Sequence, residues 1–198
     1  MPQYLGSAIR LTALTWVLFG IGYPLLEVGI NQTLFPGAAN GSLVRVDGRV
    51  AGSRLIEQPF TGPLWFHGRP SAVHDNPRTS GASNLGPASH QLFGELVARR
   101  ALLDQAHPSL TGKQLPADMI TSSASGLDPD ITPASAYIQA SWVARARGIP
   151  LDVVRRLVIT HITQPWLGLF GNARVNVLML NLALQNMAAS AQYATMKR

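Results

Sequence analysis

The chain has 198 residues, with 16 Lys and Arg against 10 Asp and Glu, a formal net charge of +6, and no cysteine. The lack of cysteine excludes disulfide frameworks, thiol nucleophiles and cysteine-ligated zinc sites. Charged residues make up only 13% of the chain, about half the usual fraction in soluble proteins. The basic residues are scattered along the chain, which argues against nucleic-acid binding. The composition therefore favours a protein that lies partly in lipid.

The first predicted element is the apolar segment Leu11–Ile30, whose only charged residue is Glu27. About twenty helical residues rise roughly 30 Å, the thickness of a bilayer's hydrocarbon core. We therefore expect a transmembrane helix over about residues 9–30, within an N-terminal segment 1–33. A cleaved signal peptide is the competing interpretation, but the apolar run is long and no A-x-A site follows it. The residues expected to anchor the helix are Leu11, Trp16, Phe19, Pro24 and Leu26.

The charges flanking this segment do not decide which side of the membrane the rest of the chain occupies. Arg10 precedes the segment, whereas Arg45 and Arg49 follow it within about twenty residues. Loops rich in Lys and Arg stay in the cytoplasm, but long domains cross regardless of charge. Both orientations are open on this criterion.

Residues 34–198 predict one mixed α/β domain of the α+β class, because strands and helices do not alternate regularly. Asp47-Gly48 lies between two apolar runs and predicts a β-hairpin, with Arg54–Ile56 extending its second strand. The Gly-, Pro-, Ser- and Asn-rich stretch 63–90 predicts a long loop, a feature that is often functional. The later predicted elements are a helix over 91–107, a strand over 115–121, a helix over 133–147 capped by Thr132 and Gly148, a helix from Pro150, and a strand at Val175 that turns into a helix.

The segment 121–136, TSSASGLDPDITPASA, concentrates the side chains capable of chemistry. Ser123 or Ser125 with His161 and Asp128 would form a hydrolase triad, but no G-x-S-x-G sequence is present. The start of the following helix, with Gln139 nearby, would alternatively hold a phosphate or another polar ligand. The simplest interpretation is that the Ser and Thr side chains satisfy the backbone of a strand-to-helix connection.

Other catalytic and metal-binding patterns are missing from the sequence. It has no Walker A, no G-x-G-x-x-G and no H-x-x-x-H pair, so we predict no catalytic residues and no metal site. Arg69, in the FHGRPSA stretch, is expected to pair with a carboxylate inside the domain or on a partner.

Seven segments resemble one family in composition and order. They are FPGAANGSLV, GSRLIEQPFTG, FHGRPSA, SNLGP, TSSASGLDPDITPASA, VARARG and RVNVLMLNLAL. Behind one N-terminal span, they are similar to the C subunit of the Kdp potassium-transporting P-type ATPase of bacteria, the KdpC family. The resemblance covers nearly the whole chain. The sequence departs from the family at Glu57, where the family usually has Gly, and at Asn172-Ala173, Met179 and Gln185.

The resemblance implies a non-catalytic accessory subunit that assembles and stabilises an ATP-driven potassium pump. The implied partners are a channel-like potassium-translocating subunit, an ATP-hydrolysing P-type subunit and a small single-span subunit. The implied location is the cell inner membrane, with a cytoplasmic N-terminus and a periplasmic C-terminal domain. No covalently bound cofactor is implied.

The family is also described as a catalytic chaperone that raises the ATP affinity of the hydrolysing subunit. Gln139 is similar to the family glutamine proposed to touch ATP, but a periplasmic domain does not meet cytosolic ATP, so we give the topology precedence. The alternative function is a membrane-anchored Ser/His hydrolase or nucleotide-binding protein. The candidate ligand or partner contacts are Arg69, Ser123, Ser125, Asp128, Gln139, Arg174 and Asn176.

Overall fold

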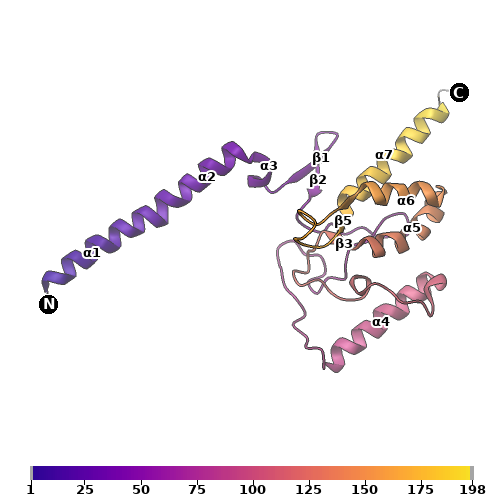
Figure 1. Ribbon diagram of the computed structural model, residues 1–198, viewed down its shortest axis with the longest axis horizontal. Coiled ribbons are helices and arrows are strands. Elements are labelled where there is room, and N and C mark those ends of the chain that lie inside the picture. The colour runs from indigo at the N-terminus through magenta and orange to yellow at the C-terminus, as the bar shows by residue number, and fades with distance from the viewer. Residues whose placement is uncertain (1, 197–198) are drawn as a thin grey trace. The chain divides into compact units, whose positions relative to one another are not determined.

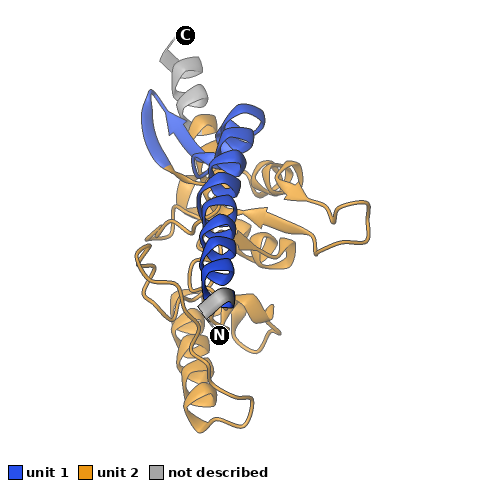
Figure 2. Ribbon diagram, turned by 90° about the vertical axis from the view of Figure 1, so that its left-hand side faces the viewer, with its two compact units in different colours: residues 1–51 blue, residues 52–198 orange. Residues whose placement is uncertain are grey.

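The computed structural model describes the backbone of residues 2–196 and the side chains of residues 4–187. The chain divides into two compact units, Met1–Ala51 and Gly52–Arg198 (Figure 2). The fold is mixed α/β, as the sequence predicts.

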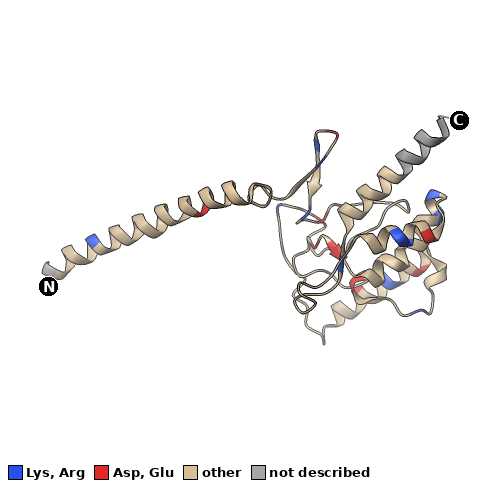
Figure 3. Cartoon of the chain, turned by 45° about the horizontal axis from the view of Figure 1, so that its top comes forward, with Lys and Arg blue, Asp and Glu red and all other residues tan. Residues whose placement is uncertain are grey.

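Unit 1 begins with one long apolar helix. It comprises α1 (Pro2–Val17), the π-helical turn η1 (Leu18–Gly22) and α2 (Tyr23–Leu34). The stretch Tyr4–Leu34, 31 residues with mean hydropathy 1.6, is long and apolar enough to cross a membrane. This confirms the predicted apolar helix, which extends beyond the expected 9–30. Its described part carries one basic and one acidic residue, Arg10 and Glu27 (Figure 3).

The π turn has a local cause. Pro24 has no N–H, and its ring would collide with the carbonyl four residues earlier in a regular helix. One wider turn directly before Pro24 relieves that collision. In it, the N–H of Tyr23 donates to the carbonyl of Leu18. The proline therefore alters the local pitch without ending the helix.

A short helix, α3 (Pro36–Ala39), leads into the predicted hairpin of β1 (Leu43–Val46) and β2 (Arg49–Ser53). Asp47 and Gly48 both have positive φ, 50° and 78°, as a two-residue turn of this kind requires. The expected extension of the second strand through Arg54–Ile56 is wrong. The Ser53 hydroxyl accepts the N–H of Leu55 at 3.1 Å, which turns the chain instead of extending it.

Unit 2 contains a small antiparallel sheet in the order β3-β5-β4 (Figure 1). Asp130 pairs with Asn176 in the register of β3 and β5, and Ile162 pairs with Val175 in that of β4 and β5. The strand bounds are β3 (Asp130–Ile131), β4 (Ile162–Thr163) and β5 (Arg174–Asn176). Its helices are α4 (His90–Ala106), α5 (Pro133–Arg147), α6 (Leu151–Thr160) and α7 (Val177–Met196).

The core of unit 2 forms where α5, α6, α7 and the sheet meet. Its fully buried side chains include Phe66, Val143, Val158, Val175 and Leu180. Helix α5 begins and ends where the sequence predicts. The Thr132 hydroxyl accepts the N–H of Ser135 at 3.1 Å, and Gly148 adopts φ 65° at the other end.

The strand expected over 115–121 is wrong, because this segment forms a 3-10 turn, Ala117–Met119. The turn places the Asp118 carboxylate at the start of α5. It accepts the Thr132 N–H at 2.7 Å and the Ser135 hydroxyl at 2.6 Å. An extended strand would withdraw this buried carboxylate from those donors.

The predicted long loop is confirmed, since no helix or strand lies between Ser53 and His90 in the described chain. Hydrogen bonds to the serine-rich segment hold it in place. The N–H of Gly81 donates to the carbonyl of Ser125 at 2.8 Å, and the Ser71 hydroxyl donates to that of Gly126 at 2.7 Å. The two loops therefore form one joined structure.

Replacing Gly126 with alanine is expected to lower the free energy of unfolding by about 2–4 kcal/mol. Gly126 has φ 69°, and an added Cβ would lie 2.6 Å from Val73 Cγ2 and 2.9 Å from the Gly81 carbonyl oxygen. Thermal or denaturant unfolding of the full chain in detergent measures the effect. Gly94→Ala is the matched control: space around Gly94 in α4 is open, so stability should rise by about 0.5–1 kcal/mol. Equal effects of the two substitutions would contradict the prediction.

Candidate functional site

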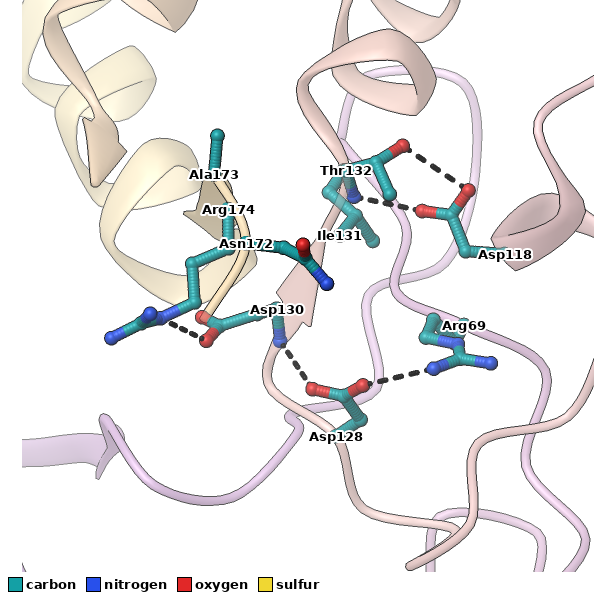
Figure 4. A pocket seen from close by; sticks show the side chains of 9 residues that line it. All are labelled: Arg69, Asp118, Asp128, Asp130, Ile131, Thr132, Asn172, Ala173 and Arg174. Carbon is teal, nitrogen blue, oxygen red and sulfur yellow. Dashed lines mark hydrogen bonds and ion pairs between the residues drawn. The ribbon is translucent and has the colours of Figure 1, made fainter. Parts of the chain in front are cut away.

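A charged pocket of about 210 Å³ lies where the two loops meet the sheet of unit 2 (Figure 4). Three carboxylates and two guanidinium groups line it, and every one of these side chains interacts with a neighbour. The charged lining residues are Arg69, Asp118, Asp128, Asp130 and Arg174.

Arg69 pairs with a carboxylate inside its own domain, one of the two kinds of partner that the sequence predicts. Its Nη1 lies 3.2 Å from Asp128 Oδ2, and its Nη2 donates to the Ser122 carbonyl at 3.2 Å. The other oxygen of Asp128 accepts the N–H of Asp130 at 3.1 Å. Arg69 and Asp128 thus connect the FHGRPSA stretch to the serine-rich loop and the sheet.

Arg174 lines the pocket from β5, and Asn176 lies two residues further along the same strand. Arg174 Nε lies 3.0 Å from Asp130 Oδ2, and the Asn176 amide donates to Asp130 Oδ1 at 3.1 Å. The same amide donates to the Arg54 carbonyl at 3.0 Å. The structure therefore brings together four of the seven predicted contact residues: Arg69, Asp128, Arg174 and Asn176.

The pairing of these groups limits what the pocket does chemically. Asp128 and Asp130 each bind an arginine at 3.2 Å and 3.0 Å, so both carboxylates already have partners inside the domain. No cluster of three or more His, Asp or Glu suited to a metal ion occurs among the described residues. The interactions seen here connect loops and strands, which makes the pocket a rigid polar junction.

Ser123, Ser125 and His161 are not brought together. Ser123 is buried, and its N–H donates to the Pro70 carbonyl at 3.1 Å, while the Ser125 hydroxyl accepts the N–H of Leu127 at 3.1 Å. His161 Nδ1 lies 2.8 Å from the carbonyl oxygen of Leu157. Within residues 4–187, no hydrogen bond joins His161 to either serine. The Ser125 hydroxyl instead supports the loop backbone, whereas the buried Ser123 hydroxyl has no hydrogen-bond partner among the described residues.

Gln139 lies on α5 and uses its side-chain amide to bind the backbone of His67. Its Oε1 accepts the His67 N–H at 2.8 Å, and its Nε2 donates to the His67 carbonyl at 3.0 Å. Gln139 is buried. A ligand contact by Gln139 stays a prediction, and it would require this pair of bonds to open.

A second buried amide, which the sequence analysis missed, repeats this arrangement one residue earlier. Asn181 on α7 accepts the Phe66 N–H at 2.9 Å and donates to the Phe66 carbonyl at 2.9 Å. Two helices thus hold two consecutive residues by all four backbone polar groups; we call this the amide clamp. One signal pointed to it, an asparagine within the apolar run VLMLNLAL.

Glu57 is the other residue that the sequence analysis did not single out as a site. Its side chain is 7% exposed, and Oε1 lies against Gly68, where any Cβ would collide with it. Oε2 has no hydrogen-bond partner among the described residues. Burial, reinforced by the negative charges of Asp75 and Asp128, raises the pKa of the Glu57 carboxyl to about 8, although Arg69 opposes the rise.

These features define a class of protein. It has one N-terminal helix that is able to cross a membrane, followed by a small mixed α/β domain in which polar side chains bond loops and strands of the domain itself. The family model described as "K+-transporting ATPase, c chain" matches residues 5–186. The chain therefore belongs to the KdpC family.

Curated relatives are similar to this chain over almost their whole length. A potassium-transporting ATPase KdpC subunit from Nitratidesulfovibrio vulgaris is 50% identical over 185 residues, covering 92% of this chain and 93% of the relative. Those from Gemmatimonas aurantiaca and Acidobacterium capsulatum are 47% and 46% identical, covering 96% and 93% of this chain and 96% and 99% of the relatives. The predicted family is confirmed.

Proposed function

We propose that this chain is an accessory subunit of a bacterial ATP-driven potassium pump, which it assembles and stabilises. The observation that carries the proposal is the family match over residues 5–186, together with the apolar helix Tyr4–Leu34. The relatives are named subunits of a potassium-transporting ATPase, so partner chains are expected. The proposed partners are the channel-like potassium-translocating subunit, the ATP-hydrolysing subunit and a small single-span subunit.

In this proposal the apolar helix anchors the chain in the cell inner membrane, with the N-terminus in the cytoplasm and the domain 34–198 in the periplasm. The resemblance to the family supports this orientation, since the flanking charges favour neither side. A catalytic-chaperone role would then act through contacts between subunits. A direct ATP contact by Gln139 has less support, because that side chain is buried and its amide already binds His67.

Deleting Leu11–Ile30 is expected to abolish co-purification of the other pump subunits, because the helix both tethers the chain and offers a surface to neighbouring spans. The measurement is affinity purification from detergent-solubilised membranes, with the full-length chain as the reference. A reporter fused after Arg198 should be active on the periplasmic side. Intact pump recovered with the truncated chain would refute the proposal.

The Ser/His hydrolase alternative and the accessory-subunit proposal predict different effects of the same double substitution on growth. If Ser125 and His161 were catalytic, replacing both with alanine would abolish the chain's contribution to potassium-limited growth. We expect normal growth of the double variant, because the Ser125 hydroxyl bonds the backbone of its own loop and the His161 ring bonds the end of α6.

A further inference from the structure

The loop between β4 and β5 contains a tight turn that is closed by an isolated antiparallel bridge between Trp166 and Phe170. Trp166 and Phe170 face each other across it. The Trp166 N–H donates to the Phe170 carbonyl at 2.9 Å, and the Phe170 N–H donates to the Trp166 carbonyl at 3.0 Å. Their ring centroids lie 5.6 Å apart. The turn is therefore preorganised by its own backbone.

This turn presents four large apolar side chains to solvent. Trp166 is 69% exposed, Leu167 71%, Leu169 80% and Phe170 61%. We call these four residues the β4–β5 knob. Leu167 also has φ 53°, a left-handed conformation that is unfavourable for a branched side chain. A rigid, strained turn that exposes apolar surface contributes little to the core, and contiguous exposed apolar surface marks contact sites.

The charges around the knob favour a protein partner over lipid. Residues 162–173 contain no Asp, Glu, Lys or Arg, and the adjacent Arg174 is paired with Asp130 at 3.0 Å. Segments that insert into the membrane surface usually carry Lys and Arg that attract anionic lipids. The polar residues of the same loop, such as Gln164 and Asn172, are uncharged. An aromatic centre with a polar rim is the pattern of a protein–protein contact.

The size of the knob also selects among protein partners. The exposed parts of the four side chains amount to roughly 500 Å², judging from the 150–250 Å² that a single aromatic side chain buries. A free-standing dimer needs about 800 Å² per partner, so the knob alone is too small to pair two copies of this chain. A small contact is sufficient when both partners are already held in one membrane assembly, because tethering raises their effective concentration.

We infer that the β4–β5 knob docks into an apolar pocket on a neighbouring subunit of the same membrane complex. This inference rests on the proposed function, which supplies the neighbouring subunit. It adds the surface by which unit 2, separately from the membrane helix, contacts that neighbour.

Photo-crosslinking from within the knob tests the inference. A benzophenone amino acid replaces Leu169 in the full chain, expressed in membranes with all the other pump subunits. The expected product is an adduct with another pump subunit. The control is the same amino acid at Leu102 on α4, which is 64% exposed and should give far less product. An adduct with lipid or with a second copy of this chain, or equal yields at the two positions, would overturn the inference.

A substitution provides the second readout. Leu169→Asp should reduce recovery of the knob-dependent adduct, formed from a benzophenone at Leu167, by at least about tenfold, as expected when an interface anchor is lost. The unfolding midpoint should not change, because Leu169 is exposed. If the other subunits do not co-purify even with the unsubstituted chain, the proposed function fails. If they co-purify but the adduct persists in the Leu169→Asp chain, only the knob inference fails.

Discussion

Replacing Asn181 with leucine is expected to lower the free energy of unfolding by about 2–5 kcal/mol. Leucine fits the apolar face of α7, but it bonds neither the N–H nor the carbonyl of Phe66, which lie 2.9 Å from the Asn181 amide. Both groups would stay buried without a partner, and each such loss costs about 1–3 kcal/mol. Equilibrium denaturation of the full chain in detergent measures the change.

The matched control is Gln185→Leu, which replaces an exposed amide on the same helix and should change stability by less than about 0.5 kcal/mol. Gln139→Leu tests the other half of the amide clamp. Because Phe66 and His67 are consecutive, the two losses should not be additive, and a double-mutant cycle should give a coupling of about 0.5–3 kcal/mol. A fully stable Asn181→Leu protein would show that solvent satisfies these backbone groups.

The amide clamp has a consequence for ligand binding. His67 and Arg69 belong to the same stretch, and Arg69 forms one wall of the charged pocket. The clamp fixes the backbone that carries Arg69, so loosening it should disturb the contact between Arg69 and Asp128 as well. Any partner that recognises this surface would meet a preformed arrangement, which lowers the entropic cost of binding.

Glu57→Gln is expected to remove a pH dependence of stability and to make the protein more stable at pH 8. The pKa of the Glu57 carboxyl is about 8 in the folded protein against an ordinary 4.5, so the folded state binds this proton more tightly than the unfolded state. Its stabilising contribution is complete below pH 4.5, declines as the pH rises from 4.5 to 8, and is lost above that. The decline amounts to at most about 5 kcal/mol.

Unfolding curves of wild type and Glu57→Gln, recorded between pH 4.5 and pH 8.5, isolate this contribution because all other titrating groups are shared. The two stabilities should diverge as the pH rises, with the variant more stable. Glu95→Gln on α4 is the control, since Glu95 is partly exposed and pairs with Arg99 at 3.1 Å. If the free energies of unfolding of wild type and Glu57→Gln changed with pH in parallel, the prediction that Glu57 is buried with a raised pKa would be wrong.

Glu57 also explains the need for glycine at position 68. The carboxylate occupies the place of a Cβ there, so a larger residue at 68 would displace it.

Signals that act within a few residues were sufficient for much of the fold. The apolar helix follows from the composition of one continuous segment, and the hairpin from Asp47-Gly48, because both depend on neighbours in the chain. The limits of α5 follow from Thr132 and Gly148 for the same reason. The seven ordered segments predicted the family, and the match of the family model over residues 5–186 confirms it.

Only the tertiary structure decided the roles of the polar side chains. The segment 115–121 resembles a strand locally, yet it forms a turn in which Asp118 bonds Thr132 and Ser135 at the start of α5. Asn181 and Phe66 are 115 residues apart in the chain, and no local pattern signals that they meet. Glu57 is buried against Gly68, and its N–H donates to the Leu127 carbonyl at 3.0 Å, so its surroundings come from distant parts of the chain. A polar side chain takes its partners and its pKa from whatever the fold places around it, and these neighbours come from distant parts of the sequence.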